Sequence, residues 1–197
     1  MRKDYEIILK LIPENSKVLD IGCSDGELIS YLENKGVSAQ GVELNQEKVI
    51  KCLEKGLDVI HGDINLIVED FPFNQFDYCL LTQTIQAVQK PDKLLNTLKK
   101  VSKNIIVSFN NSARLSKILN FLLSGSFDSL LKKADSDHWY NTDYIHPCSI
   151  KDFKKLAENL DLKIISTFDV INQRKFENGK IPSNLFCKEV LFHITDE

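Results

Sequence analysis

The chain of 197 residues carries 25 lysines and arginines against 28 aspartates and glutamates, for a formal net charge of −3, and 43% of its residues are hydrophobic. This length and composition predict one globular domain, residues 1–197, with a sizeable core, and they exclude a wholly disordered chain. No basic run is long enough to neutralise a phosphate backbone, and no apolar run reaches the roughly 20 residues that cross a bilayer, so we expect neither nucleic acid nor a membrane as partner.

The five cysteines are scattered along the chain and form no C-x-x-C pair. They indicate reduced thiols rather than a disulfide framework or a zinc site, and we expect no bound metal. The first residues, from Met1 to Asp4, lack the apolar core of a signal peptide. We therefore expect a cytoplasmic protein.

The first predicted element is an amphipathic helix that ends near Pro13. Its apolar residues recur at the helical spacing i, i+3, i+4 and i+7. They are Tyr5, Ile8, Leu9 and Ile12. We expect this helix to pack beside the first strand.

A buried strand over residues 18–21 leads into a short loop with two glycines, and an amphipathic helix follows. Glycine at the exit of a strand lets a ligand approach the backbone, and a helix starting there presents free N–H groups. The dinucleotide fingerprint G-x-G-x-x-G starting at Gly22 would need glycines at 24 and 27, and the chain has neither. The acidic-x-Gly-x-Gly-x-Gly loop of class I S-adenosylmethionine (SAM) methyltransferases matches Asp20, Gly22 and Gly26, and its middle glycine is replaced by Ser24. Asp20, the acid that precedes the first glycine, also suits a cationic ligand.

Three residues of this loop have further interpretations. Asp25 and Glu27 lie at the start of the helix, where an acid complements the helix dipole without any ligand. Ser24 can take the conformation of the missing glycine only if its φ stays negative.

The second strand, predicted over residues 39–44, carries an acid near its end. Glu43 lies 21 residues beyond Gly22. In nucleotide-binding α/β folds an acid at about this distance accepts hydrogen bonds from the ribose hydroxyls. Asn45 is a good cap for the next helix, which Gly56 ends.

A third strand over residues 57–60 runs into Gly62 and Asp63. In the class I SAM methyltransferases an acid at this place accepts a hydrogen bond from the adenine amino group of the cofactor. The alternative is a turn-forming Gly-Asp pair, and for the motif alone the two interpretations are about equal. Because Asp20 and Glu43 lie at matching strand ends, the ligand-binding interpretation is favoured.

A fourth strand over residues 76–81 is followed by polar residues, which border the ligand at the carboxyl end of strands in doubly wound folds. Gln83, Thr84 and Gln86 are therefore candidate site residues. A further helix and a fifth strand over residues 104–109 complete four strand–helix alternations, which predict a parallel sheet.

From about residue 110 to 148 the alternation of strands and helices stops. We interpret this range as an insertion of the kind that forms lids or binding surfaces. It contains one short helix, from Leu115 to near Gly125. A capping box of Ser149 and Asp152 starts the helix that follows the insertion.

Two last strands are predicted over residues 162–168 and 190–194, with a polar loop over residues 172–187 between them. We expect these two strands to form an antiparallel edge of the sheet.

Five sequence blocks together resemble the MetW family, a branch of the class I SAM-dependent methyltransferase superfamily, over nearly the whole chain. The blocks are residues 18–23, 41–43, 62–63, 83–88, and 139–142 with 145–146. The last two blocks are specific to that branch, whereas the glycine loop and the acids mark only the superfamily. Residues 110–114 depart from the Pro-Asn-Phe-type segment of the family.

The resemblance implies an α/β fold with a Rossmann-like class I methyltransferase sheet, mostly parallel with an antiparallel carboxyl-terminal edge and with helices on both faces. It also implies bound SAM or S-adenosylhomocysteine (SAH), a role in methionine biosynthesis and a homoserine O-acyltransferase (MetX) as partner, and we add a homodimer as an expectation. The predicted cofactor-binding residues are Asp20, Gly22, Cys23, Ser24, Gly26, Glu43, Leu44, Gly62, Asp63, Ile64, Thr82 and Gln83.

Two functions of different classes stay open. A small-molecule methyltransferase mainly positions its acceptor, so few residues are obligatory, and the weak candidates for catalytic residues are His138, Tyr140 and His146. Each histidine also has a structural interpretation. The other function is a SAM- or SAH-binding regulatory subunit that activates the acyltransferase without transferring a methyl group, and it fits the family branch better.

Overall fold

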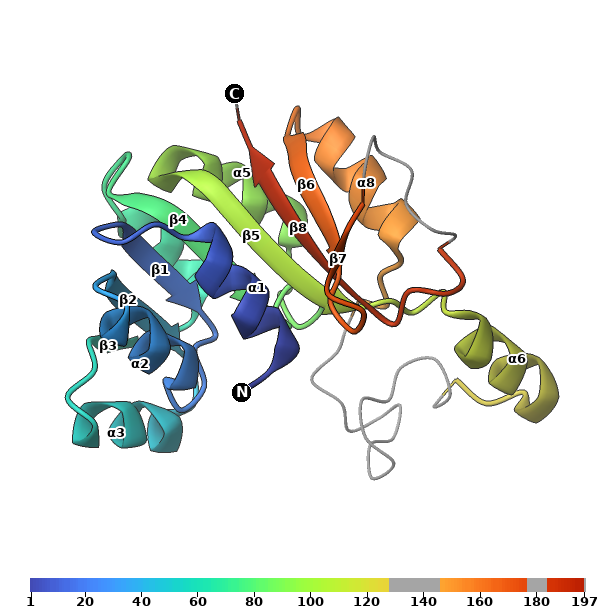
Figure 1. Cartoon of the computed structure of the whole chain (residues 1–197), viewed down its shortest axis with the longest axis horizontal. Helices are drawn as coiled ribbons and strands as arrows, with labels where there is room; N and C mark the ends of the chain where they lie inside the picture. The colour runs from blue at the N-terminus through green and yellow to red at the C-terminus, as the bar shows by residue number, and fades with distance from the viewer. Residues whose placement is uncertain (128–145, 177–183, 197) are drawn as a thin grey trace.

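The computed structural model describes residues 1–127, 146–176 and 184–196, which place one sheet between two layers of helices (Figure 1). The strands are β1 (Lys17–Ile21), β2 (Ser38–Glu43), β3 (Val59–His61), β4 (Phe76–Thr82), β5 (Ser102–Asn110), β6 (Lys163–Asp169), β7 (Arg174–Lys175) and β8 (Glu189–Thr195). The helices are α1 (Lys3–Leu11), α2 (Glu27–Asn34), α3 (Gln46–Glu54), α4 (Ile64–Ile67), α5 (Pro91–Val101), α6 (Leu115–Ser124) and α8 (Ile150–Asn159). The predicted α/β class is confirmed.

The first five strands are parallel, and the sheet has the order β3-β2-β1-β4-β5-β8-β6-β7. Parallel pairing brings the carboxyl ends of neighbouring strands to one edge, which we call the carboxyl edge. Asp20 of β1 pairs with Gly41 of β2, and Glu43 of β2 pairs with His61 of β3. The carboxyl edge lies on the lower side of the sheet in Figure 1, where β5 ends and β8 begins.

The last strands form the antiparallel edge that the sequence predicts. β8 lies between β5 and β6 and is antiparallel to both. The prediction of a continuous loop over residues 172–187 is wrong at its start, because β7 pairs with the end of β6 there. The Asp169 carboxylate explains the return of the chain, since it accepts hydrogen bonds from the backbone N–H and the side-chain amide of Asn172.

Helices cover both faces of the sheet, as predicted. Helices α1, α2 and α3 pack on one face, the α1 face, against alternate strand residues such as Val18, Leu80 and Ile106. Helices α5 and α8 pack on the opposite face. Because side chains alternate along a strand, each buried strand contributes to both cores.

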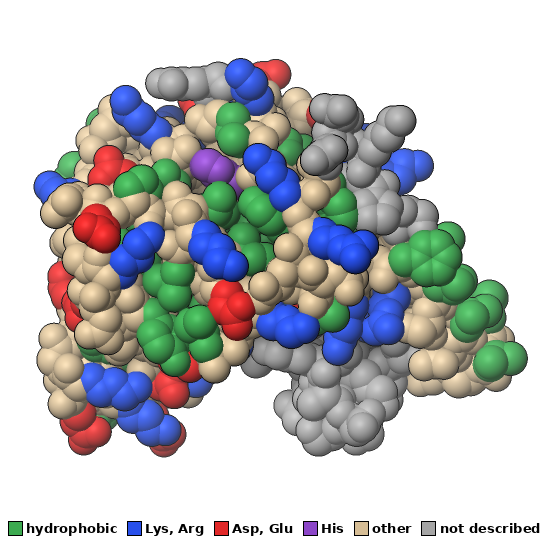
Figure 2. Space-filling model, viewed as in Figure 1, with side chains coloured by type: hydrophobic (Ala, Val, Ile, Leu, Met, Phe, Trp, Pro, Cys, Tyr) green, Lys and Arg blue, Asp and Glu red, His purple; other side chains and the backbone are tan. Residues whose placement is uncertain are grey.

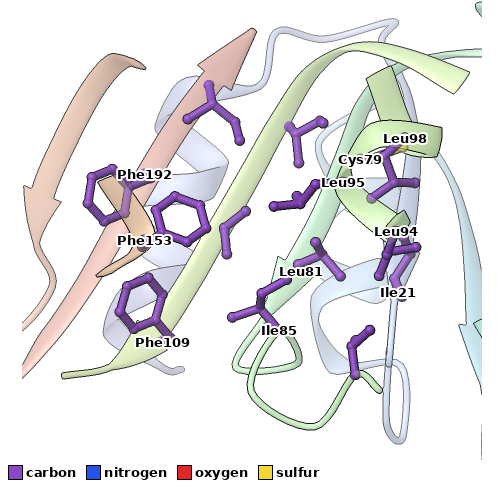
Figure 3. Close-up of a cluster of buried hydrophobic side chains, with 14 of the residues drawn as sticks. Ile21, Cys79, Leu81, Ile85, Leu94, Leu95, Leu98, Phe109, Phe153 and Phe192 are labelled. Atoms are coloured by element: carbon purple, nitrogen blue, oxygen red, sulfur yellow. The ribbon is translucent and has the colours of Figure 1, made fainter. Parts of the chain in front are cut away.

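The core opposite the α1 face contains three fully buried aromatic rings (Figure 3). Phe153 of α8 lies 5.3 Å from Phe109 of β5 and 4.7 Å from Phe192 of β8 between ring centroids. The predicted capping box is present, because Ser149 accepts from the Asp152 N–H while the Asp152 carboxylate accepts from the Ser149 N–H. This cap and these rings fix α8 on the antiparallel strands.

Helix α6 stands away from the sheet (Figure 1) and has no buried residue. Gly125 ends it with φ 64°, as the sequence predicts. Leu122 and Leu123 are exposed, and Figure 2 shows hydrophobic side chains gathered at this end of the molecule. Most of the predicted insertion, residues 128–145, lies outside the described residues. Within the described part of the chain, no helix has the length and apolar character needed to span a membrane.

Candidate functional site

The loop after β1 depends on two glycines in the left-handed region. Gly22 has φ 75°, and a Cβ there would lie 2.7 Å from Oγ1 of Thr84. Gly26 also has φ 75°, and its Cβ would lie 2.3 Å from Cδ1 of Leu57. A side chain at either position would be strained and would collide with a neighbour, so the loop keeps its backbone close to β4 and α3 only with glycine.

Ser24, between these glycines, has a φ of +54°. The expectation that a serine fits the conformation of the missing glycine only with a negative φ is therefore wrong. The left-handed conformation is held by its surroundings, because the Ser24 N–H donates to Glu43 Oε2 at 2.8 Å and its carbonyl accepts from the Cys52 thiol at 3.3 Å. The serine therefore keeps the glycine-like path of the loop at a cost of about 1–2 kcal/mol.

Glu43 is 8% exposed at the end of β2. Its Oε2 accepts from Ser24 N, and its Oε1 accepts from Asn45 N at 2.9 Å. A carboxylate oxygen accepts about two hydrogen bonds, so each oxygen retains one acceptor position. The carboxylate both ties the β1 loop to β2 and can accept from a pair of neighbouring hydroxyls.

Asp63 caps the short helix α4 after β3. Both of its described hydrogen bonds, from the backbone N–H and the side-chain amide of Asn65, go to Oδ1. Oδ2 has no hydrogen bond from the described residues. The turn-forming and the ligand-binding interpretations of this residue are therefore compatible, since each uses a different oxygen.

Asp20 is 1% exposed on β1, and neither oxygen of its carboxylate has a hydrogen-bond partner among the described residues. Burial raises the pKa of Asp20 to about 7, and the nearby Asp4 and Glu43 carboxylates add to this while Arg2 opposes it. An unpartnered buried carboxylate destabilises a fold unless a ligand supplies its donors. Asp20 thus indicates a missing cationic or hydrogen-bond-donating group.

Polar side chains replace apolar ones on the α1 face where the strands approach the carboxyl edge. Side-chain alternation places them on the face that also carries the apolar residues of the α1-face core. These residues, which we call the edge row, are Glu43, Asp20, Thr82, Ser108 and Glu189, from β2, β1, β4, β5 and β8.

Gln83 follows β4 with φ 60°, and its side chain is held by two other strands. Its amide donates to Glu189 Oε1 at 2.8 Å and accepts from Asn110 Nδ2 at 2.9 Å. Burial, followed by the nearby Asp4 carboxylate, raises the pKa of Glu189. The predicted site residue Gln83 therefore joins β4 to β5 and β8 and is largely satisfied within the protein.

Several residues at this site are missing from the predicted site residues, among them Asp4, Arg2, Tyr5 and Ser108. Asp4 of α1 is fully buried and accepts from Arg2 Nε at 3.1 Å, Arg2 Nη2 at 2.6 Å, Tyr5 N at 3.1 Å and Ser108 Oγ at 3.1 Å. Arg2 Nη1 donates to the Tyr5 hydroxyl, and the guanidinium lies 4.5 Å from the centroid of the Tyr5 ring. The i, i+4 spacing of Asp4 and Ile8 was the available signal, because it puts the acid on the buried side of α1.

The other predicted cofactor-binding residues lie around the same edge. Cys23 and Ile64 are buried, while Leu44 is 66% exposed directly after Glu43. A Cβ on Gly62 would lie 3.1 Å from Ile67 Cδ1. Thr82 is a buried member of the edge row.

Gln86, a further candidate, is 2% exposed, and its side-chain oxygen has no hydrogen-bond partner among the described residues. Of the candidate catalytic residues, His138 and Tyr140 lie outside the described residues. His146 is exposed, and its Nε2 lies 3.1 Å from the Gln89 carbonyl. Among described residues no cluster of His, Cys, Asp and Glu could hold a metal ion.

The arrangement fits an adenosyl ligand with a cationic end. Glu43 and Asp63 retain acceptor oxygens at neighbouring strand ends, and Asp20 lacks any donor. At Gly22 the backbone lies too close to the Thr84 side chain for any residue with a Cβ. These groups can accept hydrogen bonds from hydroxyl, amino and ammonium groups, and the described part of the site offers no paired nucleophile and base.

Sequence comparison gives a match over residues 2–194 to the family model described as "Methionine biosynthesis protein MetW". A curated relative, the "Bifunctional methionine biosynthesis protein MetXA/MetW" of Rhodopirellula baltica, is 31% identical over 202 residues, which is 96% of this chain. The chain spans 32% of that relative, about a third of its length.

Solved structures share the fold at low sequence identity. A SAM-dependent methyltransferase from Archaeoglobus fulgidus matches with a TM-score of 0.68 and 17% identity, over 98% of this chain and 91% of that one. The plantazolicin methyltransferase BamL, solved with a substrate analogue and SAH, matches with a TM-score of 0.68 and 14% identity, over 99% and 82%. At these identities the likeness establishes a SAM-methyltransferase fold.

Proposed function

This chain belongs to the MetW family of methionine biosynthesis proteins, and from that premise we propose that it binds SAM or SAH and regulates a homoserine O-acyltransferase. The observation that carries the proposal is the set of carboxylates Asp20, Glu43 and Asp63 at the ends of three adjacent strands, each with unused acceptor positions. The relative whose name joins MetXA and MetW in one polypeptide supports the partner.

The cofactor would be held from its adenine to its amino-acid end along the carboxyl edge. In the proposal, Asp63 Oδ2 accepts from the adenine amino group and Glu43 accepts from the ribose hydroxyls. The exposed Leu44 side chain covers one face of the adenine, because burial of this surface is favourable. Bound SAM supplies an activated methyl group, and bound SAH is the same ligand after that methyl has left.

Regulation is better supported than methyl transfer as the use of this site. The described residues hold ligand-accepting groups, whereas Nε2 of His61 and of His146 lies against a backbone carbonyl, that of Leu44 and that of Gln89 respectively. The occupancy of such a site follows the concentration of SAM or SAH. Coupling to a partner requires only that the free chain and the chain bound to its partner have different affinities for this ligand.

Calorimetric titration tests the cofactor claim directly. SAM or SAH should bind the wild-type chain, and Glu43→Ala and Asp63→Ala should weaken that binding. An exposed acid of α3, Glu47→Ala, is the matched control, because it removes the same group one turn away from the site. Absence of binding to the wild type would refute the cofactor claim.

Co-purification tests the partner. The chain is co-expressed with the homoserine O-acyltransferase of the same genome, and acyl transfer is measured with and without SAH. Association and a changed rate are expected. No association and no rate change would refute the regulatory proposal, and transfer of labelled methyl from SAM to a metabolite would favour the methyltransferase instead.

A further inference from the structure

The residues that follow β4, 83–89, contact both the loop after β1 and the outer surface of the molecule. We call them the β4 loop. Near its start, the Thr84 side chain lies against the backbone of Gly22, since a Cβ on that glycine would be 2.7 Å from Oγ1 and 2.9 Å from Cγ2 of Thr84. Towards its other end, the β4 loop is bonded to His146, which is exposed. A ligand on the loop after β1 therefore lies close to an element that reaches the surface.

His146 makes two hydrogen bonds to the β4 loop. Its backbone N–H donates to the Gln86 carbonyl at 3.0 Å, and its Nε2 lies 3.1 Å from the Gln89 carbonyl. A carbonyl oxygen only accepts, so Nε2 carries the proton and donates it. Because these bonds fix both the backbone and the ring of His146, a displacement of the β4 loop would move this residue as a whole.

The β4 loop is one packed unit. The Ala87 N–H donates to the Thr84 carbonyl at 2.9 Å and closes a turn. Ile85 and Val88 are each 3% exposed and belong to the core opposite the α1 face, where Figure 3 shows Ile85. Close-packed groups transmit displacements, so a shift of the Thr84 side chain reaches the Gln86 carbonyl.

Two features indicate that the β4 loop has a second arrangement. Gln83 has φ 60°, a conformation that a residue with a Cβ disfavours, and hydrogen bonds of its side chain with Glu189 and Asn110 hold it there. Gln86 is 2% exposed, yet its side-chain oxygen accepts no hydrogen bond from the described residues. A strained residue beside a buried unpaired acceptor is typical of an element in which a small change of contact selects between two packings.

We propose that the β4 loop couples the cofactor site to the acyltransferase, with Thr84 and His146 as the positioning residues at its two ends. This rests on the proposed function, which supplies the ligand and the partner. A cofactor on the loop after β1 displaces the Thr84 side chain, the β4 loop changes its packing, and His146 moves at the surface. The acyltransferase then changes the affinity for SAH by the same factor by which SAH changes the affinity for the acyltransferase.

NMR of the histidine rings tests the first half of this coupling without the partner. SAH is titrated to saturation at constant pH, and the ring resonance of His146 is assigned by its absence from the spectrum of His146→Ala. This resonance should shift when SAH binds. His193 is the internal control, because its Nε2 lies 2.9 Å from Oδ1 of Asn104, near the start of β5 and away from the carboxyl edge, and its resonance should stay in place.

Thr84→Ala tests the contact with the loop after β1. It removes the two side-chain atoms nearest to Gly22, so the shift of the His146 resonance should be largely lost. The shift is compared at saturating SAH, where a change in SAH affinity does not enter. Thr84→Ser keeps Oγ1 and should keep part of the shift, and Thr97→Ala on α5, the matched control, should keep all of it.

The second half of the coupling is measured by titrating SAH into the free chain and into its complex with the acyltransferase. The two affinities should differ about fivefold or more in the wild type, and His146→Ala should bring them to within about twofold of each other. Thermal melting shows that each variant is folded. If Thr84→Ala unfolds the chain, Thr84→Ser and this second measurement decide.

SAH binding without a shift of the His146 resonance overturns the inference and leaves the cofactor site standing. A shift that is undiminished in Thr84→Ala, or an affinity difference that persists in His146→Ala, also overturns it. A wild type that binds no SAH refutes the cofactor claim, and equal SAH affinities of the free and assembled wild type refute the regulatory claim. Either of these two results removes this inference as well.

Discussion

On the β1–β3 side of the carboxyl edge, acidic side chains keep acceptor oxygens without partners, whereas on the β4–β8 side Gln83, Asn110 and Glu189 bond one another. Asp20 lacks any described donor, yet Gln83 joins Asn110 to Glu189 across three strands. Both sides are polar ends of buried strands. The difference shows that unused hydrogen-bonding capacity, rather than polarity, distinguishes a binding edge from a structural one.

Among the tests of this contrast, we expect the largest effect from Glu43→Ala. It removes the proposed acceptor for two ribose hydroxyls and also the partner of the strained Ser24 N–H, so SAH affinity should fall about a hundredfold. Calorimetry measures the loss, with Glu47→Ala as the control. Retention of wild-type affinity would mean that Glu43 serves only to tie the loop to β2.

Asp63→Ala should have a smaller effect. It removes the proposed acceptor for the adenine amino group and the cap of a four-residue helix, so we expect about a tenfold loss of SAH affinity. Asn65→Ala loses the side-chain contact but keeps the acid, and should bind SAH normally. Equal losses in both variants would assign the effect to α4 instead of the ligand.

The unpartnered acid should make the ligand-free protein less stable as the pH rises. Burial raises the pKa of Asp20 to about 7, whereas an unfolded aspartate titrates near 3.8, so between these values the folded state holds a proton that the unfolded state has released. Stability from this group is therefore greatest at low pH and is lost as the pH rises through about 7.

Thermal or urea unfolding of the wild type and of Asp20→Asn checks this. Between pH 6 and 8 the wild type should lose roughly 1.4 kcal/mol relative to the variant, which cannot titrate. Parallel pH profiles would contradict the prediction.

On the β4–β8 side, Asn110→Ala should affect stability rather than binding. It removes one neutral hydrogen bond to Gln83, for a loss of about 1 kcal/mol in the free energy of unfolding. SAH affinity should stay within about twofold of the wild type, as for a group with no ligand contact. A large loss of affinity would show that this side also binds the ligand.

Ser24→Gly should have the smallest effect. Glycine adopts φ +54° without strain but loses more chain entropy on folding, so the net gain in stability should be below about 1 kcal/mol. Chemical denaturation gives the value. Marked destabilisation would mean that the serine side chain makes a contact that the backbone alone does not explain.

Most of the fold follows from local sequence patterns. Strand–helix alternation, the Gly56 and Gly125 helix ends and the Ser149 capping box were sufficient to predict elements that the structure confirms. The place of β8 between β5 and β6 was not predictable in this way, because no local pattern encodes which strands pair across a long separation.

The residues of the candidate site also differ in whether local sequence predicts them. Asp20 and Glu43 lie near the ends of predicted strands and Asp63 comes shortly after one, so spacing alone puts them at one edge. The contacts of Arg2 and Asp4 cross from α1 to β5 and depend on how the helix is set on the sheet. The positive φ of Ser24 was not predictable from the sequence because tertiary hydrogen bonds hold a conformation that the residue itself disfavours.

The central position of β8 also bears on how the chain is made. Until the ribosome has released residues 189–195, β5 has a bare edge of N–H and C=O groups, a template on which another nascent chain could add a strand. Closing this pairing is slow because it joins distant parts of the chain. While β5 is unpaired, this edge therefore favours association between chains.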